Sequence, residues 1–269
     1  MSSLALVLLL AGIFGLVIGS FLNVCIYRLP RGKSIVSPPS ACPRCSTPLR
    51  PWENIPVVSY LFLRGRCRGC GEPISLRYPL VELLNGALYV LVVYTFGTGW
   101  HLPLLFAFIS ALVVITFIDL DFQIIPDVIT LPGIVIGLAA ASLVLPDPFA
   151  LGSVTPQDAQ IVGITNAAIG FLLGGGLFYL IAVLSRGGMG GGDIKMMAMV
   201  GAFMGWKAVL LTTFLGSLAG SLIGVFLILF KGKGRKTRIP FGPFLALGAV
   251  ITLFLGEPLL RWYFTLSMR

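Results

Sequence analysis

The stretch LPLLFAFISALVVITFIDL, residues 102–120, decides what kind of protein this chain can be. A helix needs about 20 predominantly apolar residues to cross the hydrocarbon core of a bilayer, and this stretch has that length. Its apolar residues do not alternate with polar ones as in a barrel strand, so the pattern predicts a transmembrane helix. The stretch ends near Asp119, and a carboxylate behind so long an uncharged run is costly and usually functional.

The composition of the whole chain agrees with a polytopic membrane protein. The 269 residues are 57% hydrophobic and 11% charged, with a mean hydropathy of +0.99. An ordinary soluble domain carries about 25% charged residues. So few polar side chains cannot cover a soluble globule, which excludes a soluble enzyme, a disordered protein and a secreted disulfide scaffold.

Eight apolar segments predict an all-α polytopic membrane protein with about eight transmembrane helices. The segments are residues 4–27, 79–96, 102–120, 128–145, 161–184, 196–204, 208–230 and 241–260. The sixth is too short to cross a bilayer, so it is either a half-helix opening onto a cavity or a segment whose boundary is misplaced. The first has no basic region and no obvious cleavage site, so we expect a retained helix and not a removed signal peptide.

The basic residues predict the orientation in the membrane. The chain holds 19 Lys and Arg against 10 Asp and Glu, a formal charge of +9. Sixteen of the 19 bases lie in residues 28–77, 185–195 and 231–238, which share one side of the predicted body. The positive-inside rule makes this side cytoplasmic, so both termini face outward. The excess charge is therefore a topology signal with some attraction to anionic lipid, and it is not interpreted as a nucleic-acid site.

Four of the five cysteines lie in a loop rich in proline and arginine. They form two C-x2-C pairs, Cys42 with Cys45 and Cys67 with Cys70, separated by 21 residues. This spacing predicts a structural zinc site, because two such turns aim four thiolates at one point and leave no coordination position open. Disulfides are disfavoured in a reducing cytoplasm, while free thiols and a redox-active pair remain alternatives. The predicted divisions of the chain are a first helix at 1–27, the cysteine loop at 28–78 and a membrane body at 79–269.

Of the ten acidic residues, four lie near the predicted cytoplasmic side of the membrane, namely Asp119, Asp121, Asp127 and Asp193. For Asp121 and Asp127, a solvated carboxylate and a functional one fit the sequence equally well. Glu82 falls near the start of the second helix, where a carboxylate suits the helix dipole, and a pairing with Arg77 is open. Solvation alone accounts for the other five, which are Glu53, Glu72, Asp147, Asp158 and Glu257.

The segment GGMGGG, residues 187–192, precedes Asp193 and cannot form a stable helix interior. We expect it to bring the backbone close to another element and to leave Asp193 at the start of the next helix. The predicted topology puts Asp119 and Asp193 at the same depth on the cytoplasmic side. Two such carboxylates can form an aspartyl-protease dyad, in which the ionised one takes a proton from water and the protonated one polarises the peptide carbonyl.

Glycines spaced along three predicted helices indicate close helix packing and nothing further. They are Gly12, Gly15 and Gly19, then Gly174, Gly175 and Gly176, then Gly216, Gly220 and Gly224. No internal repeat is found in the sequence.

Over nearly its whole length the chain resembles the bacterial type IV prepilin leader peptidases, membrane aspartyl proteases of the GxGD class. Besides the two cysteine pairs, the matching segments are GSFLNVCIYRLPRG (19–32), NIPVVSYLFLRGRC (54–67), PISLRYPLVELLNG (73–86), IDLDFQIIPDVITLP (118–132), GGMGGGDIKMMAMVGAFMGW (187–206) and IPFGPFLALGA (239–249). So many motifs in the right order make the resemblance specific.

The resemblance implies that Asp119 and Asp193 are the catalytic aspartates, with Gly190 and Gly192 in the GxGD loop. The implied substrates are prepilins of type IV pili and the pseudopilins of type II secretion, cut on the cytoplasmic face of the inner membrane. Members with the four-cysteine loop often also N-methylate the new terminal residue with S-adenosylmethionine, so we expect both activities. The sequence assigns no residue to the binding of this methyl donor.

Two other functions fit the sequence less well than the peptidase. A transporter or proton relay also uses acids in broken helices, but it needs acids in the outer half of the membrane, which the predicted helices lack. A membrane-anchored zinc module without catalysis leaves Asp119 and the glycine run unexplained.

Overall fold

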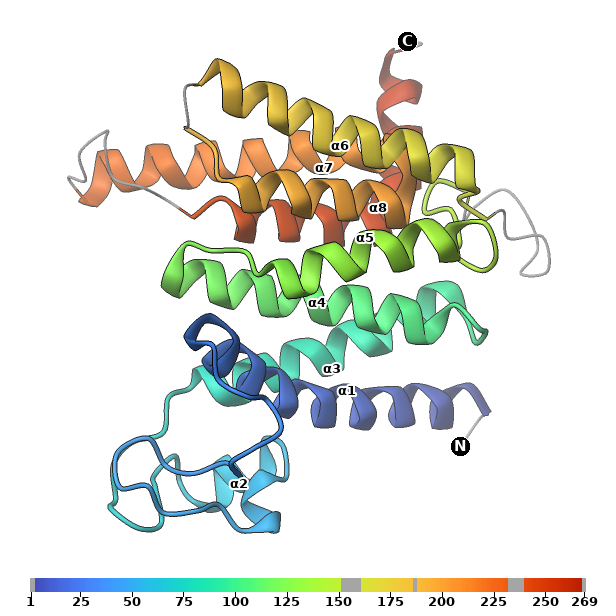
Figure 1. Cartoon of the computed structure of the whole chain (residues 1–269). Helices are drawn as coiled ribbons and strands as arrows, with labels where there is room; N and C mark the ends of the chain where they lie inside the picture. Colours follow the sequence, from blue (N-terminus) through green and yellow to red (C-terminus); the bar gives the residue numbers. More distant parts are fainter. Residues whose placement is uncertain (1–2, 151–160, 186–187, 232–239, 268–269) are drawn as a thin grey trace. The chain divides into compact units, whose positions relative to one another are not determined.

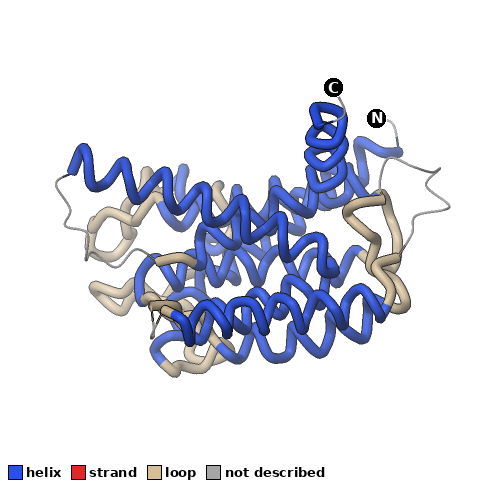
Figure 2. Tube along the Cα trace, turned by 90° about the horizontal axis from the view of Figure 1, so that it is seen from above, coloured by secondary structure: helices blue, strands red, loops and turns tan. Residues whose placement is uncertain are grey.

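The structure, a computed structural model, describes residues 3–150, 161–185, 188–231 and 240–267. Within these ranges the regular structure is helical, with isolated bridges in place of strands. Figure 2 shows the helices running through most of this part of the trace, with loops between their ends. The prediction of an all-α protein is confirmed. The helices form two compact units, Met1–Thr98 with Phe106–Val114, and Gly99–Leu105 with Ile115–Arg269.

In the first unit α1 (Ser3–Arg28) packs along α3 (Arg77–Phe96), and the middle of α4 (Leu102–Phe122) belongs to the same unit (Figure 1). The cysteine loop connects α1 to α3. It has little regular structure of its own, namely the 3-10 turns Leu29–Arg31 and Pro51–Asn54 and the short helix α2 (Val58–Phe62).

Glycines let α1 and α3 approach closely. A Cβ atom on Gly15 would lie 2.8 Å from Cα of Gly86, and one on Gly19 would lie 2.7 Å from Cα of Glu82. The side chain of Asn85 then crosses the contact, since its Nδ2 donates to the Gly15 carbonyl at 2.8 Å. The packing role predicted for these glycines is confirmed.

The second unit contains α5 (Asp127–Ala141), α6 (Ile164–Leu184), α7 (Gly191–Lys231) and α8 (Gly242–Ser267), with the end of α4. Helix α7 contacts each of α5, α6 and α8. Its contact with α6 is backbone against backbone, because a Cβ atom on Gly170 would lie 2.6 Å from the carbonyl carbon of Gly205.

Helix α7 is broken at Gly205, whose φ of 81° and ψ of 178° are not helical. The two halves correspond to the sixth and seventh predicted segments, and the first half begins at Gly191. The predicted start of the sixth segment was therefore five residues late. The break occurs at a residue without a side chain, since a positive φ strains most other residues.

Within the described part of the chain, six helices are long and apolar enough to cross a membrane: α1, α3, α4, α6, α7 and α8. The eight predicted segments correspond to these six, to the second half of α7 and to the shorter apolar helix α5. The chain is accordingly a multi-pass membrane protein. Asp158, Arg186, Gly187 and residues 232–238 of the predicted basic loop lie outside the described residues.

Candidate active site and candidate metal centre

Asp119 lies in the last turn of α4, in the second unit. The helix ends because Gln123 adopts the left-handed conformation, with φ at 54°, and donates its N–H to the Asp119 carbonyl at 2.9 Å. The Asp119 side chain is 5% exposed. Its Oδ2 accepts a hydrogen bond of 2.9 Å from the backbone N–H of Gly242, the first residue of α8. The carboxylate is therefore held by the start of another helix.

Asp193 lies in the first turn of α7, two residues after Gly191 begins the helix. Its backbone N–H donates to the carbonyl of Gly190 at 3.1 Å, which closes the turn out of the glycine segment. The prediction that the glycine run leads into a helix at Asp193 is confirmed. Asp193 and Asp119 belong to the same unit. Gly192, next to Asp193, and Gly242, whose N–H bonds to Asp119, both lie against Ile125, so the structure brings together the segments that carry the two predicted carboxylates.

Ile125 packs against both segments that carry these two aspartates. A Cβ atom on Gly192 would lie 2.7 Å from Cβ of Ile125, and one on Gly242 would lie 3.3 Å from its Cδ1. Ile125 is 9% exposed and follows α4 directly, so the chain after Asp119 touches both the GxGD loop and the start of α8. A side chain at Gly192 would push these segments apart. Around Gly190 there is more room, because the nearest atom to its Cβ, Oδ2 of Asp193, is 3.4 Å away.

A surface ion pair joins the starts of α5 and α7. Nζ of Lys195 contacts both carboxylate oxygens of Asp127 at 2.7 Å. Asp127 is therefore an exposed carboxylate that is paired with a base. Asp121, in the last turn of α4, also has an interaction partner.

The four cysteines of the loop form the second candidate site. Their Sγ atoms all lie within 4.8 Å of one another, with Cys42 and Cys70 4.0 Å apart and Cys45 and Cys67 3.8 Å apart. Four sulfurs bound to one zinc at about 2.3 Å in a tetrahedron are spaced about 3.8 Å from each other. The sulfurs therefore fit a tetrahedral metal ion. All four are free thiols, which argues against the disulfide alternative.

The two cysteine pairs have the same local fold. The N–H of Cys42 donates to the Thr47 carbonyl at 3.0 Å, and the N–H of Cys67 donates to the Glu72 carbonyl at 2.8 Å. An isolated bridge flanks each turn, one from Ala41 to Pro48 and one from Arg66 to Pro73. Both turns share the pattern C-x2-C-x2-P, so the expectation that the sequence contains no internal repeat is wrong for this loop. The equal spacing of Cys, Cys and Pro was the signal that could have revealed it.

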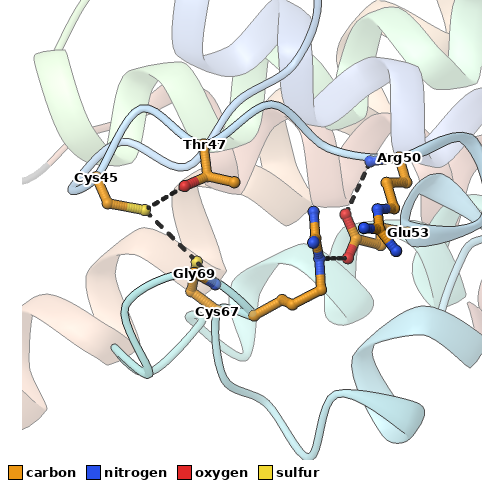
Figure 3. A network of polar contacts seen from close by, with 7 residues as sticks. Cys45, Thr47, Arg50, Glu53, Cys67 and Gly69 are labelled. Carbon is orange, nitrogen blue, oxygen red and sulfur yellow. Dashed lines mark hydrogen bonds and ion pairs between the residues drawn. The ribbon is translucent and has the colours of Figure 1, made fainter.

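The surroundings of the sulfurs favour the thiolate form at Cys45 and Cys67 and oppose it at Cys70. The Thr47 hydroxyl, 3.1 Å from Sγ of Cys45, lowers the pKa of that thiol to about 6 (Figure 3). Backbone N–H groups, led by that of Cys70, lower the pKa of Cys67. At Cys70 a backbone hydrogen bond at Glu72 lowers the pKa, but desolvation and the neighbouring sulfurs outweigh it and raise the pKa to about 12. A divalent cation would remove this repulsion between thiolates.

Glu53 and Glu82 do more than the solvation and dipole roles predicted for them. Glu53 accepts the Arg50 N–H at 2.8 Å and pairs with Arg68 at 2.6 Å, so it ties the two halves of the cysteine loop together (Figure 3). The Arg50 N–H is the main reason why the pKa of Glu53 is lowered. Glu82 lies in the second turn of α3 and not in the first, and its Oε2 accepts the Val57 N–H at 2.7 Å.

Comparison with known proteins gives consistent matches over most of the chain. The model of the bacterial peptidase A24 N-terminal domain matches residues 13–96, and the model of the type IV leader peptidase family matches residues 106–225. Three relatives carry the name prepilin leader peptidase/N-methyltransferase. The protein of Aeromonas hydrophila is 40% identical over 94% of this chain and 92% of its own. That of Pseudomonas aeruginosa is 37% identical over 93% and 91%, and that of Legionella pneumophila 35% over 95% and 93%. No solved structure gives a significant match.

Proposed function

The chain belongs to the type IV leader peptidase family, and on this premise we propose that it cleaves the leader of prepilins and methylates the new N-terminal residue. The observation that supports the peptidase activity is that the segments carrying Asp119 and Asp193, far apart in the sequence, both lie against Ile125 in one unit. Each lies at the end of an apolar helix, where a carboxylate without a function would be costly.

In this proposal the two aspartates act as a general base and a general acid. The ionised carboxylate takes a proton from water as the water oxygen attacks the peptide carbonyl carbon. The protonated carboxyl polarises the carbonyl oxygen and then donates its proton to the leaving amine. Because the two groups interact, their protons titrate as a property of the pair.

The glycines around the dyad serve as positioning residues. Gly242 supplies the N–H that fixes Asp119, and Gly192 allows the GxGD loop to lie against Ile125. Positioning matters for rate because a displacement of about 1 Å in an active site costs about a hundredfold.

The charge distribution supports a cytoplasmic active site in the bacterial inner membrane. If α3 and α4 each cross the bilayer, the cysteine loop and Asp119 lie on the same side, and this side carries most of the bases. A basic leader would remain at this surface while the apolar stem of the pilin sits in lipid. The proposed partners are therefore prepilins, pseudopilins and membrane lipid, and no nucleic acid.

The cysteine cluster is proposed to bind one structural zinc ion through Cys42, Cys45, Cys67 and Cys70. The sulfur distances fit a tetrahedron, and all four ligand positions are filled by protein. None of the buried apolar side chains lies in this loop, residues 28–78, so the metal would supply much of its folding free energy.

For the methylation, the relatives' name gives the reaction class and S-adenosylmethionine is the proposed donor. When bound, it supplies the methyl group that the new terminal amine receives. The proposed systems served are type IV pili and type II secretion.

The peptidase proposal is tested by expressing Asp119→Asn and Asp193→Asn with a prepilin and following leader removal by mass spectrometry. Each change should lower cleavage by at least about a thousandfold, since it removes a proton-transfer group. Glu72→Gln, which changes an exposed carboxylate of the cysteine loop, is the matched control and should cleave normally. Normal cleavage by either aspartate variant, at equal amounts in the membrane, would show that the dyad is assigned wrongly.

A further inference from the structure

The first unit contains a cavity of about 440 Å³ between the end of α1, the cysteine loop and the start of α3. Cavities that bind drug-sized ligands have volumes of about 300–1,000 Å³. Ser20, Asn23 and Glu82 line the cavity on the helix side, and Cys42 and Cys67 line it on the loop side. The proposed peptidase chemistry uses none of these residues.

Glu82 is the most unusual group in the cavity wall. Glu82 is only 7% exposed, and a glutamate is almost never so deeply buried unless its carboxylate is paired. Its one hydrogen bond to the backbone comes from Val57. Among the described residues, no lysine or arginine forms an ion pair with Glu82. A buried carboxylate without a counter-charge is stabilised most by a cation that enters beside it.

The other lining groups extend this chemistry. Asn23 on α1 is 8% exposed, and its Nδ2 donates to the carbonyls of Tyr78 and Gly19 at 3.1 and 3.4 Å. Both bonds use the amide nitrogen, so the amide oxygen is available as an acceptor for a ligand. The rings of Tyr27 and Tyr78 also line the cavity, and aromatic faces attract cations. Arg28, Arg44 and Arg68 also line the cavity, and Arg68 is paired with Glu53. The cavity therefore suits a ligand that carries a cationic group for Glu82, a carboxylate for the arginines, hydrogen-bond donors and apolar surface.

We propose that this cavity binds S-adenosylmethionine, with Glu82 as the counter-charge to the cationic methionine part of the donor. That part carries a sulfonium and an ammonium group for Glu82 and a carboxylate for the arginines of the wall, and the adenine part carries donors and an aromatic face. The inference rests on the proposed methylation activity and assigns it a place in the chain. It also explains why a cysteine cluster would accompany methylation, since Cys42 and Cys67 form part of the cavity wall.

The first test measures binding without any prepilin. The purified full chain, loaded with zinc and reconstituted in lipid nanodiscs, is titrated calorimetrically with S-adenosylmethionine. Glu82→Gln keeps the shape of the side chain and removes its charge, so it should raise the Kd of this ligand by about tenfold or more. Methylthioadenosine has no cationic group, so its Kd should be the same in the wild type and in Glu82→Gln.

Two further variants control for damage to the fold. Asp127→Asn makes the corresponding chemical change at an exposed carboxylate that does not line the cavity, and it should change the Kd by less than about twofold because water screens its charge. Glu82→Asp keeps the charge and should bind S-adenosylmethionine more tightly than Glu82→Gln. An unchanged Kd in Glu82→Gln, or an equal loss for both ligands, would overturn the assignment.

A second test needs no variant. The wild type is irradiated with ultraviolet light in the presence of S-adenosylmethionine carrying a tritiated methyl group, and the labelled peptides are identified. The label should lie within residues 20–82, which include the cavity wall. Label confined to peptides beyond residue 115, from a wild type that binds the donor and methylates, would refute the cavity and leave the proposed methylation intact. A wild type that cleaves prepilin but neither binds the donor nor methylates would instead refute the methylation itself.

Discussion

The backbone N–H of Gly242 donates a hydrogen bond of 2.9 Å to Oδ2 of Asp119, and this bond joins the start of α8 to the end of α4. A Cβ atom at position 242 would lie 2.8 Å from the same oxygen. Gly242→Ala should therefore displace the Asp119 carboxylate and lower leader cleavage by about a hundredfold, the effect of a displacement near 1 Å. The rate is measured with purified enzyme and prepilin in detergent.

Gly176→Ala is the matched control for this prediction. Gly176 lies in α6 of the same unit, and a Cβ atom there would meet no atom within 4 Å. This variant should cleave at the wild-type rate. Equal rates for Gly242→Ala and Gly176→Ala would mean that the bond to Gly242 does not position Asp119.

The difference between Asp119 and Gly242 shows what the sequence can reveal about the candidate site. Acids are so rare in apolar helices that Asp119 and Asp193 stand out without any knowledge of their contacts. Gly242 contributes a backbone N–H, which every residue except proline carries, so no residue pattern marks it. Its role depends on where α8 begins relative to α4, and that is a property of tertiary packing.

The helices themselves were predictable because long apolar runs leave a helix as the main option in a membrane. The break in α7 was found only as a short sixth segment, since one glycine among many gives no sign that its φ is positive. The partner of Glu82 was not predictable either. Glu82 bonds to Val57, 25 residues before it, and this contact depends on the path of the cysteine loop.

Loss of any cysteine of the cluster should release the metal. Cys45→Ser or Cys67→Ser leaves three thiolates, which bind zinc much less tightly than four. Metal analysis should find about one zinc per chain in the wild type and far less in each variant. Cys25→Ala is the control, because this fifth cysteine is buried in α1 away from the cluster, and it should keep its zinc. A wild type without zinc, purified without chelators, would contradict the metal site.

The metal should also be lost on acidification. In the folded loop the pKa of Cys45 is lowered to about 6 and that of Cys67 is lowered too, so folding favours their thiolates. A thiol whose pKa is lower in the folded loop than in the unfolded chain stabilises the folded loop at pH values above its unfolded pKa. This stabilisation is lost as the pH falls through the lowered pKa. Zinc content, measured after gel filtration at each pH, should be constant at neutral pH and fall on acidification, because protons then compete with the metal for the four thiolates. Retention of zinc at pH 4 would argue against thiolate ligands.

The ion pair between Asp127 and Lys195 should matter little for stability. Both side chains are more than one third exposed, at 54% and 39%, and exposed pairs contribute about 0–1 kcal/mol. Asp127→Asn should therefore shift the melting temperature of the protein in detergent only slightly, and the shift should vanish in about 1 M salt, where charges are screened within 3 Å. A large loss of stability that persists at high salt would indicate another role for Asp127.

The packing of α6 on α7 should be the most sensitive part of the second unit. A Cβ atom on Gly201 would lie 2.8 Å from the backbone nitrogen of Phe171, and backbone atoms cannot move aside as a flexible side chain can. Gly201→Ala should therefore destabilise the unit by about 1–3 kcal/mol, the usual cost of overpacking.

Where the new methyl group meets no other atom, alanine stabilises a helix relative to glycine by about 0.5–1 kcal/mol. A Gly→Ala change without overlap should therefore raise the stability of the unit and not lower it. Gly175→Ala provides that comparison, because its Cβ atom would lie 3.6 Å from Cβ of Ala198, an ordinary contact. Thermal unfolding in detergent should show a lower melting temperature for Gly201→Ala and an equal or higher one for Gly175→Ala. Equal melting temperatures for Gly201→Ala and the wild type would mean that α6 and α7 do not touch through their backbones.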